Sequence, residues 1–167
     1  MAGIMGTLPA SNTSMPSVAA AFQYLQSEFD AMPPVAAQQV RVAGYADGRM
    51  RLSAPLEANV NDKHCAFGGS LVTLLTLAGW GLVTHRLHEH GLVADVFVAD
   101  SRIRYLAPLY ADLQAEAVLA EGESWEAFEA MFRQRGKARI EVLARVALPD
   151  GGVATELAGR FVAKAKG

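Results

Sequence analysis

The sequence feature that most constrains the fold is a run of twenty residues without a charge, from Cys65 to Thr84. About 18 apolar residues with few charges are enough for a helix to cross a bilayer. Four glycines and four hydroxyl side chains interrupt this run, however, and segments with the pattern of strands lie on both sides of it. A helix that is apolar on every side is equally suited to a protein interior. We therefore expect a helix that other parts of the chain cover, and no membrane association.

The size and charge of the chain exclude several classes of protein. With 167 residues there is room for one domain, which we place at residues 16–167, after a flexible tail at residues 1–15. The net charge is −2 and neither sign forms a long run, which argues against a nucleic-acid or polybasic membrane partner. Cys65 has no partner for an internal disulfide, and the first residues lack the pattern of a secretory signal. We therefore expect a cytoplasmic protein.

The segments around the uncharged run predict a sheet and two further helices. Apolar residues at helical spacing predict a helix over residues 17–32, which Pro33 stops. Residues 124–136 predict a short helix that Ser124 caps and Gly136 ends. The long apolar helix should end at Gly91, and most other segments alternate with period two. The predicted fold class is α+β, with a curled antiparallel sheet of about six strands wrapped around the one long helix.

Two motifs carry a resemblance to a known superfamily: NVNDKHCAFGGSL, which leads into the long helix, and VADSRIRYLAP, which forms the next strand. They resemble the hotdog-fold enzymes that act on acyl thioesters, and more narrowly the thioesterase domain that follows an acetyltransferase domain in some bacterial proteins. The resemblance covers residues 35–165. It implies an acyl-thioester hydrolase, with acyl-CoA as the expected substrate, coenzyme A as part of that substrate, and no separate cofactor or metal. It also implies a homo-oligomer, a dimer or a dimer of dimers, that pairs through its long strands.

The resemblance places the reaction beside the start of the long helix, at the subunit boundary. Backbone N–H groups there suit the negative oxygen that forms when a thioester carbonyl is attacked. Gly68 and Gly69 would let the substrate approach the backbone closely. Phe67 stands where the resembling thioesterases often carry a histidine, so we expect substrate contacts from the backbone of Phe67, Gly68 and Gly69.

Two polar residues before the helix are candidate catalytic groups. Asp62 is expected to hold or deprotonate the attacking water, and Asn61 to orient the water or the carbonyl. The alternative is that one of them only caps the helix, since both residue types favour that position. Asn59 and Lys63 are weaker candidates.

The helix itself departs from a related family pattern. Thioesterases of the phenylacetyl-CoA type carry an acidic residue seven positions after the second glycine, where this chain has Thr76. Thr76 is a candidate substrate contact, and the alternative is a hydrogen bond to its own helix backbone.

The strand after the helix supplies two further candidates. Strict alternation places Asp100 with Arg102 and Arg104 on one face, and Phe97 with Ile103 on the other. Asp100 is a candidate catalytic carboxylate from the neighbouring subunit, and Arg102 or Arg104 is a candidate ligand of coenzyme A phosphates, Arg104 being the one we select. The alternative is an ion-pair cluster on the outward face of the sheet, unless a bulge turns Asp100 inward.

The cysteine and histidines have simpler interpretations. Cys65, beside His64, is expected to be a small core residue rather than a nucleophile. His85, His88 and His90 lie near the end of the long helix, where cations are favoured, and no metal site is expected there.

The sequence therefore predicts an acyl-CoA thioester hydrolase. A non-catalytic acyl-thioester binder of the same fold is the main alternative, since no carboxylate occurs between Asp62 and Glu89, where the related enzymes have their helix acid. Hydration of enoyl thioesters and a purely structural module are the remaining alternatives.

Overall fold

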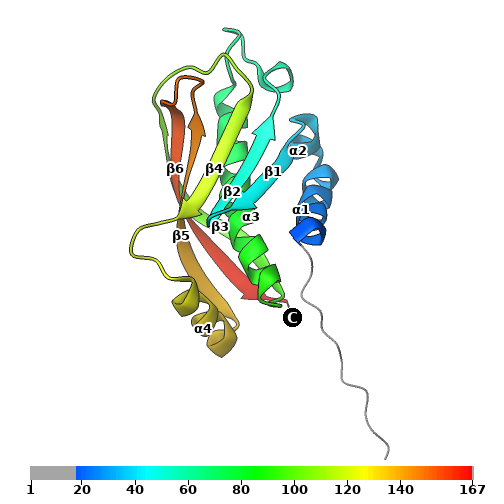
Figure 1. The fold of residues 1–167 in the computed structure, drawn as a ribbon, viewed down its shortest axis with the longest axis vertical. Helices are drawn as coiled ribbons and strands as arrows, with labels where there is room; N and C mark the ends of the chain where they lie inside the picture. Colours follow the sequence, from blue (N-terminus) through cyan, green and yellow to red (C-terminus); the bar gives the residue numbers. More distant parts are fainter. Residues whose placement is uncertain (1–17, 167) are drawn as a thin grey trace, which may run out of the picture.

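The computed structural model describes residues 18–166 (Figure 1). The tail expected at residues 1–15 lies outside the described residues. The elements follow in the order α1 (Val18–Ala31), α2 (Pro33–Ala37), β1 (Arg41–Ala46), β2 (Arg49–Ala54), the 3-10 turn η1 (Glu57–Asn59), α3 (Gly68–Glu89), β3 (Ala94–Tyr105), β4 (Leu113–Leu119), α4 (Trp125–Arg135), β5 (Lys137–Ala147) and β6 (Val153–Ala165).

The strands form one six-stranded sheet in the order β1-β2-β4-β5-β6-β3, and all neighbours are antiparallel. The long helix α3 lies along one face of this sheet and packs against β2, β3, β4, β5 and β6 (Figure 1). The predicted α+β class, with a curled sheet around one long helix, is confirmed. The first hairpin turns at Asp47 and Gly48, both with positive φ, as the sequence predicts.

The uncharged run is apolar because α3 is covered along most of its length. Leu74, Leu75, Ala78 and Leu82 are buried. A Cβ added at Gly79 would lie 2.6 Å from Cζ of Phe161, so glycine lets β6 approach the helix closely. Within residues 18–166, no helix has both the length and the hydropathy needed to cross a membrane.

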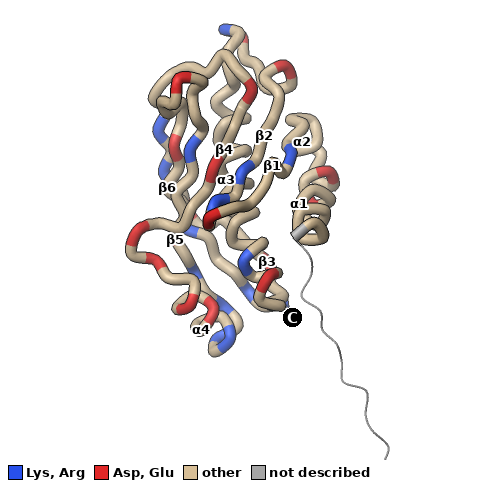
Figure 2. Tube along the Cα trace, in the orientation of Figure 1, with Lys and Arg blue, Asp and Glu red and all other residues tan. Residues whose placement is uncertain are grey.

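The sheet has two faces of opposite character. Along β5, buried and exposed residues alternate at every position. Ile140, Val142 and Val146 belong to the core around α3, whereas Glu141 and Arg145 face away from it. Figure 2 shows charged residues of both signs along the strands. We call the face turned away from α3 the outer face.

The strand β3 forms one edge of the sheet and contains a bulge. Its register with β6 shifts between Val98, opposite Phe161, and Asp100, opposite Arg160. The extra residue, Ala99, reverses the alternation before it. Phe97 therefore lies on the outer face, where Nζ of Lys164 is 5.8 Å from its ring. The expectation that Phe97 shares a face with Ile103 is wrong, because strict alternation does not continue through a bulge.

The shorter helices follow their capping signals. Ser124 accepts a hydrogen bond from the Ala127 N–H at 3.2 Å, and Gly136 ends α4 with a φ of 64°. Both predictions for this helix are confirmed. The first helix ends at Ala31, but Pro33 then starts the short helix α2 instead of a loop. Proline suits the first turn of a helix, where its missing N–H costs nothing.

Candidate active site

The loop before α3 contains a tight turn that is held by hydrogen bonds between its own residues, 61–65. The Asn61 side-chain oxygen accepts hydrogen bonds from the backbone N–H of Lys63 at 2.8 Å and of Cys65 at 3.2 Å. The Asn61 N–H donates to the Cys65 carbonyl at 2.8 Å, and His64 between them has a φ of 62°. Asn61 thus holds the shape of the loop. Cys65 is buried beneath it, with Nδ2 of Asn61 3.3 Å from its sulfur.

Asp62 lies at the exposed tip of the same loop. Its side chain is 79% exposed and pairs with Nζ of Lys63 at 2.9 Å. The N-cap residue of α3 is Phe67, and within residues 18–166 no side chain accepts a hydrogen bond from the first N–H groups of this helix. The alternative in which Asn61 or Asp62 caps α3 is therefore wrong. Asp62 instead presents an exposed carboxylate, six residues before the first residue of the helix.

Asn59 is a structural residue rather than a site residue. It is buried, and its side-chain amide donates to the carbonyls of Gln38 and Pro55 at 2.9 and 2.8 Å. Its backbone carbonyl accepts the Phe67 N–H at 2.7 Å. The Phe67 amide is thus already engaged, which leaves the N–H groups of later residues to bind a ligand.

The first turn of α3 offers free backbone donors. Among residues 18–166, the N–H groups of Gly68, Gly69 and Ser70 have no hydrogen-bond acceptor, whereas the Leu71 N–H donates to the Phe67 carbonyl at 3.0 Å. Three such groups at the positive end of a helix dipole form a site for a negative oxygen.

Two aromatic side chains frame these donors. The Phe67 ring folds back over Gly69 so closely that a Cβ at Gly69 would overlap it. Tyr105, at the end of β3, donates from its hydroxyl to the Gly68 carbonyl at 3.2 Å. A Cβ at Gly68 would lie 3.3 Å from the Tyr105 ring, so a side chain at either glycine would make a neighbouring ring move.

The surroundings of the helix start are apolar and exposed. The loop before the helix is joined to the segment after β3 by the hydrogen bond from the Ala66 N–H to the Leu109 carbonyl at 2.8 Å. Five large apolar side chains at this end of the molecule are more than 40% exposed: Val60, Phe67, Tyr105, Leu106 and Tyr110. We call them the aromatic patch. Exposed apolar clusters of this kind mark binding surfaces.

Tyr105 and Tyr110 are site residues that were not predicted from the sequence. For Tyr105 the signal was present, because alternation after Asp100 places it on the α3 face, at the end of the strand closed by Pro108. For Tyr110, which lies outside any regular element, no period exists from which to predict its exposure.

Two threonines of α3 differ in their hydrogen bonding: the Thr73 hydroxyl bonds to the helix backbone, and the Thr76 hydroxyl does not. The Thr73 hydroxyl donates to the Gly69 carbonyl at 3.0 Å. Within the described part of the chain, the half-buried hydroxyl of Thr76 makes no hydrogen bond, so the backbone-bonded alternative does not describe it. With a rise of 1.5 Å per residue, Thr76 lies roughly 10 Å along α3 from Gly69.

Asp100 and Arg104 lie on the outer face, away from α3 of their own chain. Asp100 is 3.5 Å from Arg160, and Arg104 donates to Glu156 at 2.9 Å. This is the ion-pair arrangement that the sequence analysis gave as the alternative. The β3 bulge moves Phe97 and leaves Asp100 in place. Neither side chain adjoins the free N–H groups of the same chain, whose face of the sheet is the opposite one.

The histidines gather where the far end of α3 meets α1, β1 and α4. His85 is buried between the rings of Tyr45, at 4.3 Å, and Phe22, at 5.8 Å. Burial lowers the pKa of His85, Glu89 opposes that effect, and His88 adds to it. No group of three or more potential metal ligands occurs within residues 18–166.

A curled antiparallel sheet around one long helix is the hotdog fold, which this chain shares with solved structures of thioesterases. Residues 22–165 match the family described as "Putative thioesterase (yiiD_Cterm)". The chain belongs to that family, and this membership supports thioester hydrolysis as its general chemistry.

Solved structures give the same assignment of fold. A protein of unknown function from Chlorobaculum tepidum TLS superposes with a TM-score of 0.84 at 27% identity, covering 93% of this chain and 100% of that one. A putative thioesterase from Shewanella oneidensis gives 0.76 at 28% identity, covering 87% and 98%. A probable thioesterase from Pseudomonas aeruginosa, at 21% identity and a TM-score of 0.72, covers 90% and 97% and shares the fold.

Proposed function

We propose that this protein hydrolyses acyl thioesters, with acyl-CoA as substrate, at a site that begins with the first turn of α3. The observation that carries the proposal is the set of free N–H groups of Gly68, Gly69 and Ser70 beside the exposed aromatic patch. These donors suit the oxyanion of the tetrahedral intermediate, and the patch suits an acyl chain or pantetheine arm.

Asp62 is the proposed base for the attacking water. It accepts the proton as the water oxygen bonds to the thioester carbon, and the carbonyl oxygen gains its negative charge beside the free N–H groups. The carbon–sulfur bond then breaks, and the leaving thiolate takes up a proton. Asn61 keeps Asp62 in place by holding the turn. Thr76 is the proposed contact for the acyl chain farther along α3.

A second copy of the chain is part of this proposal. The outer edge of β3 has no neighbour within the described chain, and Phe97 and Val98 along it are 53% and 43% exposed. Pairing of two β3 edges would continue the sheet, in a dimer or a dimer of dimers. Asp100 and Arg104 face away from their own α3, so their proposed roles in catalysis and phosphate binding require this second copy. A cytoplasmic location completes the proposal.

Thiol release from a series of acyl-CoA esters tests the activity. Asp62→Ala should lower the rate about a hundredfold or more, in the range of general-base catalysis. Asn61→Ala and Asp100→Ala test the two other polar residues. Glu57→Ala, an exposed acidic residue in the neighbouring turn, is the matched control and should keep the full rate. If no ester is hydrolysed, or if all three variants keep the wild-type rate, the proposal is wrong.

The second candidate is an acyl-thioester binder without hydrolysis. It is favoured by one observation: Thr76 stands in the helix where the related thioesterases have an acid, and Asp62 is the only carboxylate in the loop from Val60 to Phe67. Calorimetric binding of acyl-CoA with no thiol release would support this candidate.

A further inference from the structure

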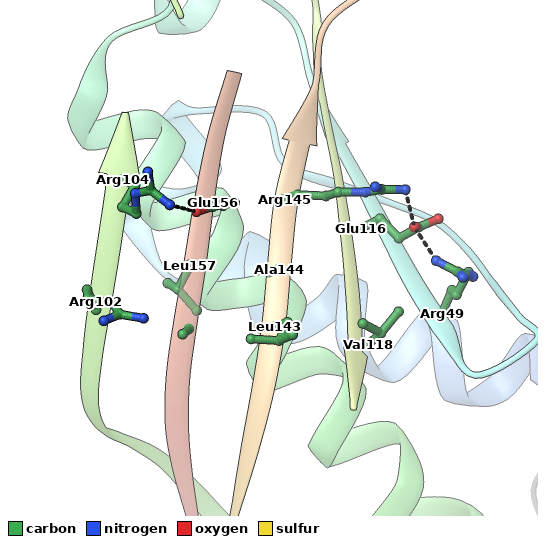
Figure 3. Close-up of a pocket in the computed structure, with 11 residues that line it drawn as sticks. Arg49, Arg102, Arg104, Glu116, Val118, Leu143, Ala144, Arg145, Glu156 and Leu157 are labelled. Atoms are coloured by element: carbon green, nitrogen blue, oxygen red, sulfur yellow. Dashed lines mark hydrogen bonds and ion pairs between the residues drawn. The ribbon is translucent and has the colours of Figure 1, made fainter. Parts of the chain in front are cut away.

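The outer face of the sheet contains a groove of which the proposed hydrolysis uses one residue, Arg104, and that one only toward a second copy of the chain. It has a volume of about 470 Å³ and crosses β2, β4, β5, β6 and β3 (Figure 3). Four arginines and two glutamates line it, together with apolar side chains: Arg49, Arg102, Arg104, Arg145, Glu116, Glu156, Val118, Leu143 and Ala158. Cavities of this volume hold small organic ligands.

One wall of the groove is a ladder of alternating charges. The strand register places Arg104, Glu156, Arg145 and Glu116 opposite one another along the groove, and the ladder continues to Arg51 beyond it. Arg104 donates to Glu156 at 2.9 Å, and Glu116 lies 3.1 Å from Arg51 and 3.4 Å from Arg145. Burial raises the pKa of Glu116, but hydrogen bonds from Arg49 and Arg51 outweigh this and hold it below its ordinary value. Both carboxylates are thus neutralised by arginines of their own chain.

The floor of the groove is the neighbouring row, which is apolar. The register aligns Arg102 with Ala158, Ala158 with Leu143, and Leu143 with Val118. Leu143 is 43% exposed, although its neighbours on β5 that face the core are buried. From β3 to β4 the row crosses three strand spacings, roughly 14 Å.

The β3 end of this apolar row is an unpaired cation. Within residues 18–166, the Arg102 side chain makes no hydrogen bond or ion pair, whereas Arg49 at the other end of the groove donates to Glu116 at 2.6 Å. Figure 3 shows Arg102 on the strand at one side of the groove and Leu143 and Val118 on strands farther across it. The groove therefore combines one free guanidinium with an elongated apolar floor.

We propose that this groove binds an amphiphilic carboxylate, with its head on Arg102 and its aliphatic chain over Ala158, Leu143 and Val118. A guanidinium forms paired hydrogen bonds with a carboxylate. The chain covers apolar surface that is otherwise exposed to water. A cationic head is disfavoured by the excess of arginines, and a compact polyanion leaves the apolar row uncovered.

The residues proposed to hold the carboxylate, Arg102, Ala158, Leu143 and Val118, have no proposed role in hydrolysis. The groove lies on the outer face, and the free N–H groups of α3 lie on the opposite face of the same sheet. Carboxylate binding in the groove therefore stands or fails independently of thioester hydrolysis, although the acid that such a hydrolysis releases has the same chemistry.

Calorimetry of the full chain with dodecanoate tests the proposal, with Arg102→Gln and Leu143→Gln as groove variants. Arg133→Gln is the matched control, because Arg133 is an exposed arginine on α4. Arg102→Gln should weaken dodecanoate binding about tenfold or more, which corresponds to the roughly 1.5–3 kcal/mol of a charged hydrogen bond. Leu143→Gln should weaken it severalfold, and Arg133→Gln should leave it unchanged.

Binding of three ligand analogues and the oligomeric state of Leu143→Gln provide the results that could contradict the proposal. Dodecyltrimethylammonium, dodecanol and inorganic pyrophosphate should each bind more weakly than dodecanoate. Equal binding of dodecanoate to wild type and both groove variants would overturn the proposal, as would tighter binding of pyrophosphate. It would also fail if Leu143→Gln dissociated a wild-type oligomer, since a second copy would then occupy the groove.

Discussion

At the scale of single residues, the candidate active site depends on one contact between neighbours in sequence. The ring of Phe67 occupies the space that a side chain at Gly69 would need. Because Gly69 has no side chain, the Phe67 ring can lie over it beside the free N–H groups. From the sequence, the two glycines were expected to let the substrate approach the backbone. That the ring of Phe67 occupies the space above Gly69 could not be predicted, because it depends on the conformation of the side chain.

A double-mutant cycle checks this contact. In a helix, alanine is more stable than glycine by up to about 1 kcal/mol. In the wild-type background, Gly69→Ala should lose this gain, because the Phe67 ring must move. In the Phe67→Ala background the same substitution should stabilise the protein by about 0.5–1 kcal/mol. Urea unfolding of the four proteins measures the coupling. Equal effects in the two backgrounds would show that the ring and Gly69 do not compete.

The second residue-scale prediction concerns His85. Its pKa is lowered from the ordinary value of 6.5, so the unfolded chain binds the proton more tightly than the folded protein. The contribution of His85 to stability is therefore complete above about pH 6.5 and is lost as the pH falls through the folded pKa. The charged and titratable groups around it are Glu89, His88 and Tyr45, with Arg86 next in sequence.

Urea unfolding between pH 8 and pH 5 measures this dependence. His85→Phe fills a similar volume between two aromatic rings. In this variant the free energy of unfolding should decrease less between pH 8 and pH 5 than in the wild type. His64→Gln, at an exposed loop position, should leave the fall unchanged. An unaltered pH profile in His85→Phe would contradict the assignment.

At the scale of elements, the sequence predicts whatever depends on a regular period or a local cap. The helix α4 is the clearest case, because Ser124 and Gly136 mark its two ends and both do so in the structure. The β3 bulge could not be predicted, since a single extra residue leaves composition and overall pattern unchanged while it reverses the faces before Ala99. The second helix was missed because the proline that stops one helix also starts the next.

The cap of α4 gives an element-scale prediction. The Ser124 oxygen accepts the Ala127 N–H, so Ser124→Ala leaves this donor without its partner. The free energy of unfolding should fall by about 1 kcal/mol. Ser124→Asp, which restores an acceptor, should recover most of the loss in the same urea titration. A loss of equal size in both variants would show that the hydroxyl stabilises α4 in some other way.

At the scale of the whole molecule, the roles proposed for Asp100 and Arg104 require a second copy of the chain. The edge of β3 is unpaired in the described chain, and the candidate residues Asp100 and Arg104 face away from the candidate site of their own chain. The sequence predicted the enclosed helix because twenty uncharged residues need cover. It could not predict which face of the sheet would hold a groove, because the outer-face arginines become neighbours only through the register of five strands.

Sedimentation measures the predicted assembly. Wild type should be a dimer or larger, and Val98→Glu at the β3 edge should shift it toward the monomer, because the new charge would be buried between two edges. Met131→Glu, at a similarly exposed position on α4, should not. A monomeric wild type would remove the proposed contribution of Asp100 from a neighbouring subunit.

The central claim is that the first turn of α3 receives the thioester carbonyl. The most direct test is the change in amide signals of isotope-labelled protein when a non-hydrolysable acyl-CoA, with an amide in place of the thioester, is added. The account predicts that the signals of Gly68, Gly69 and Ser70 shift together and saturate with one affinity. Binding of the analogue with these three signals unmoved would contradict it.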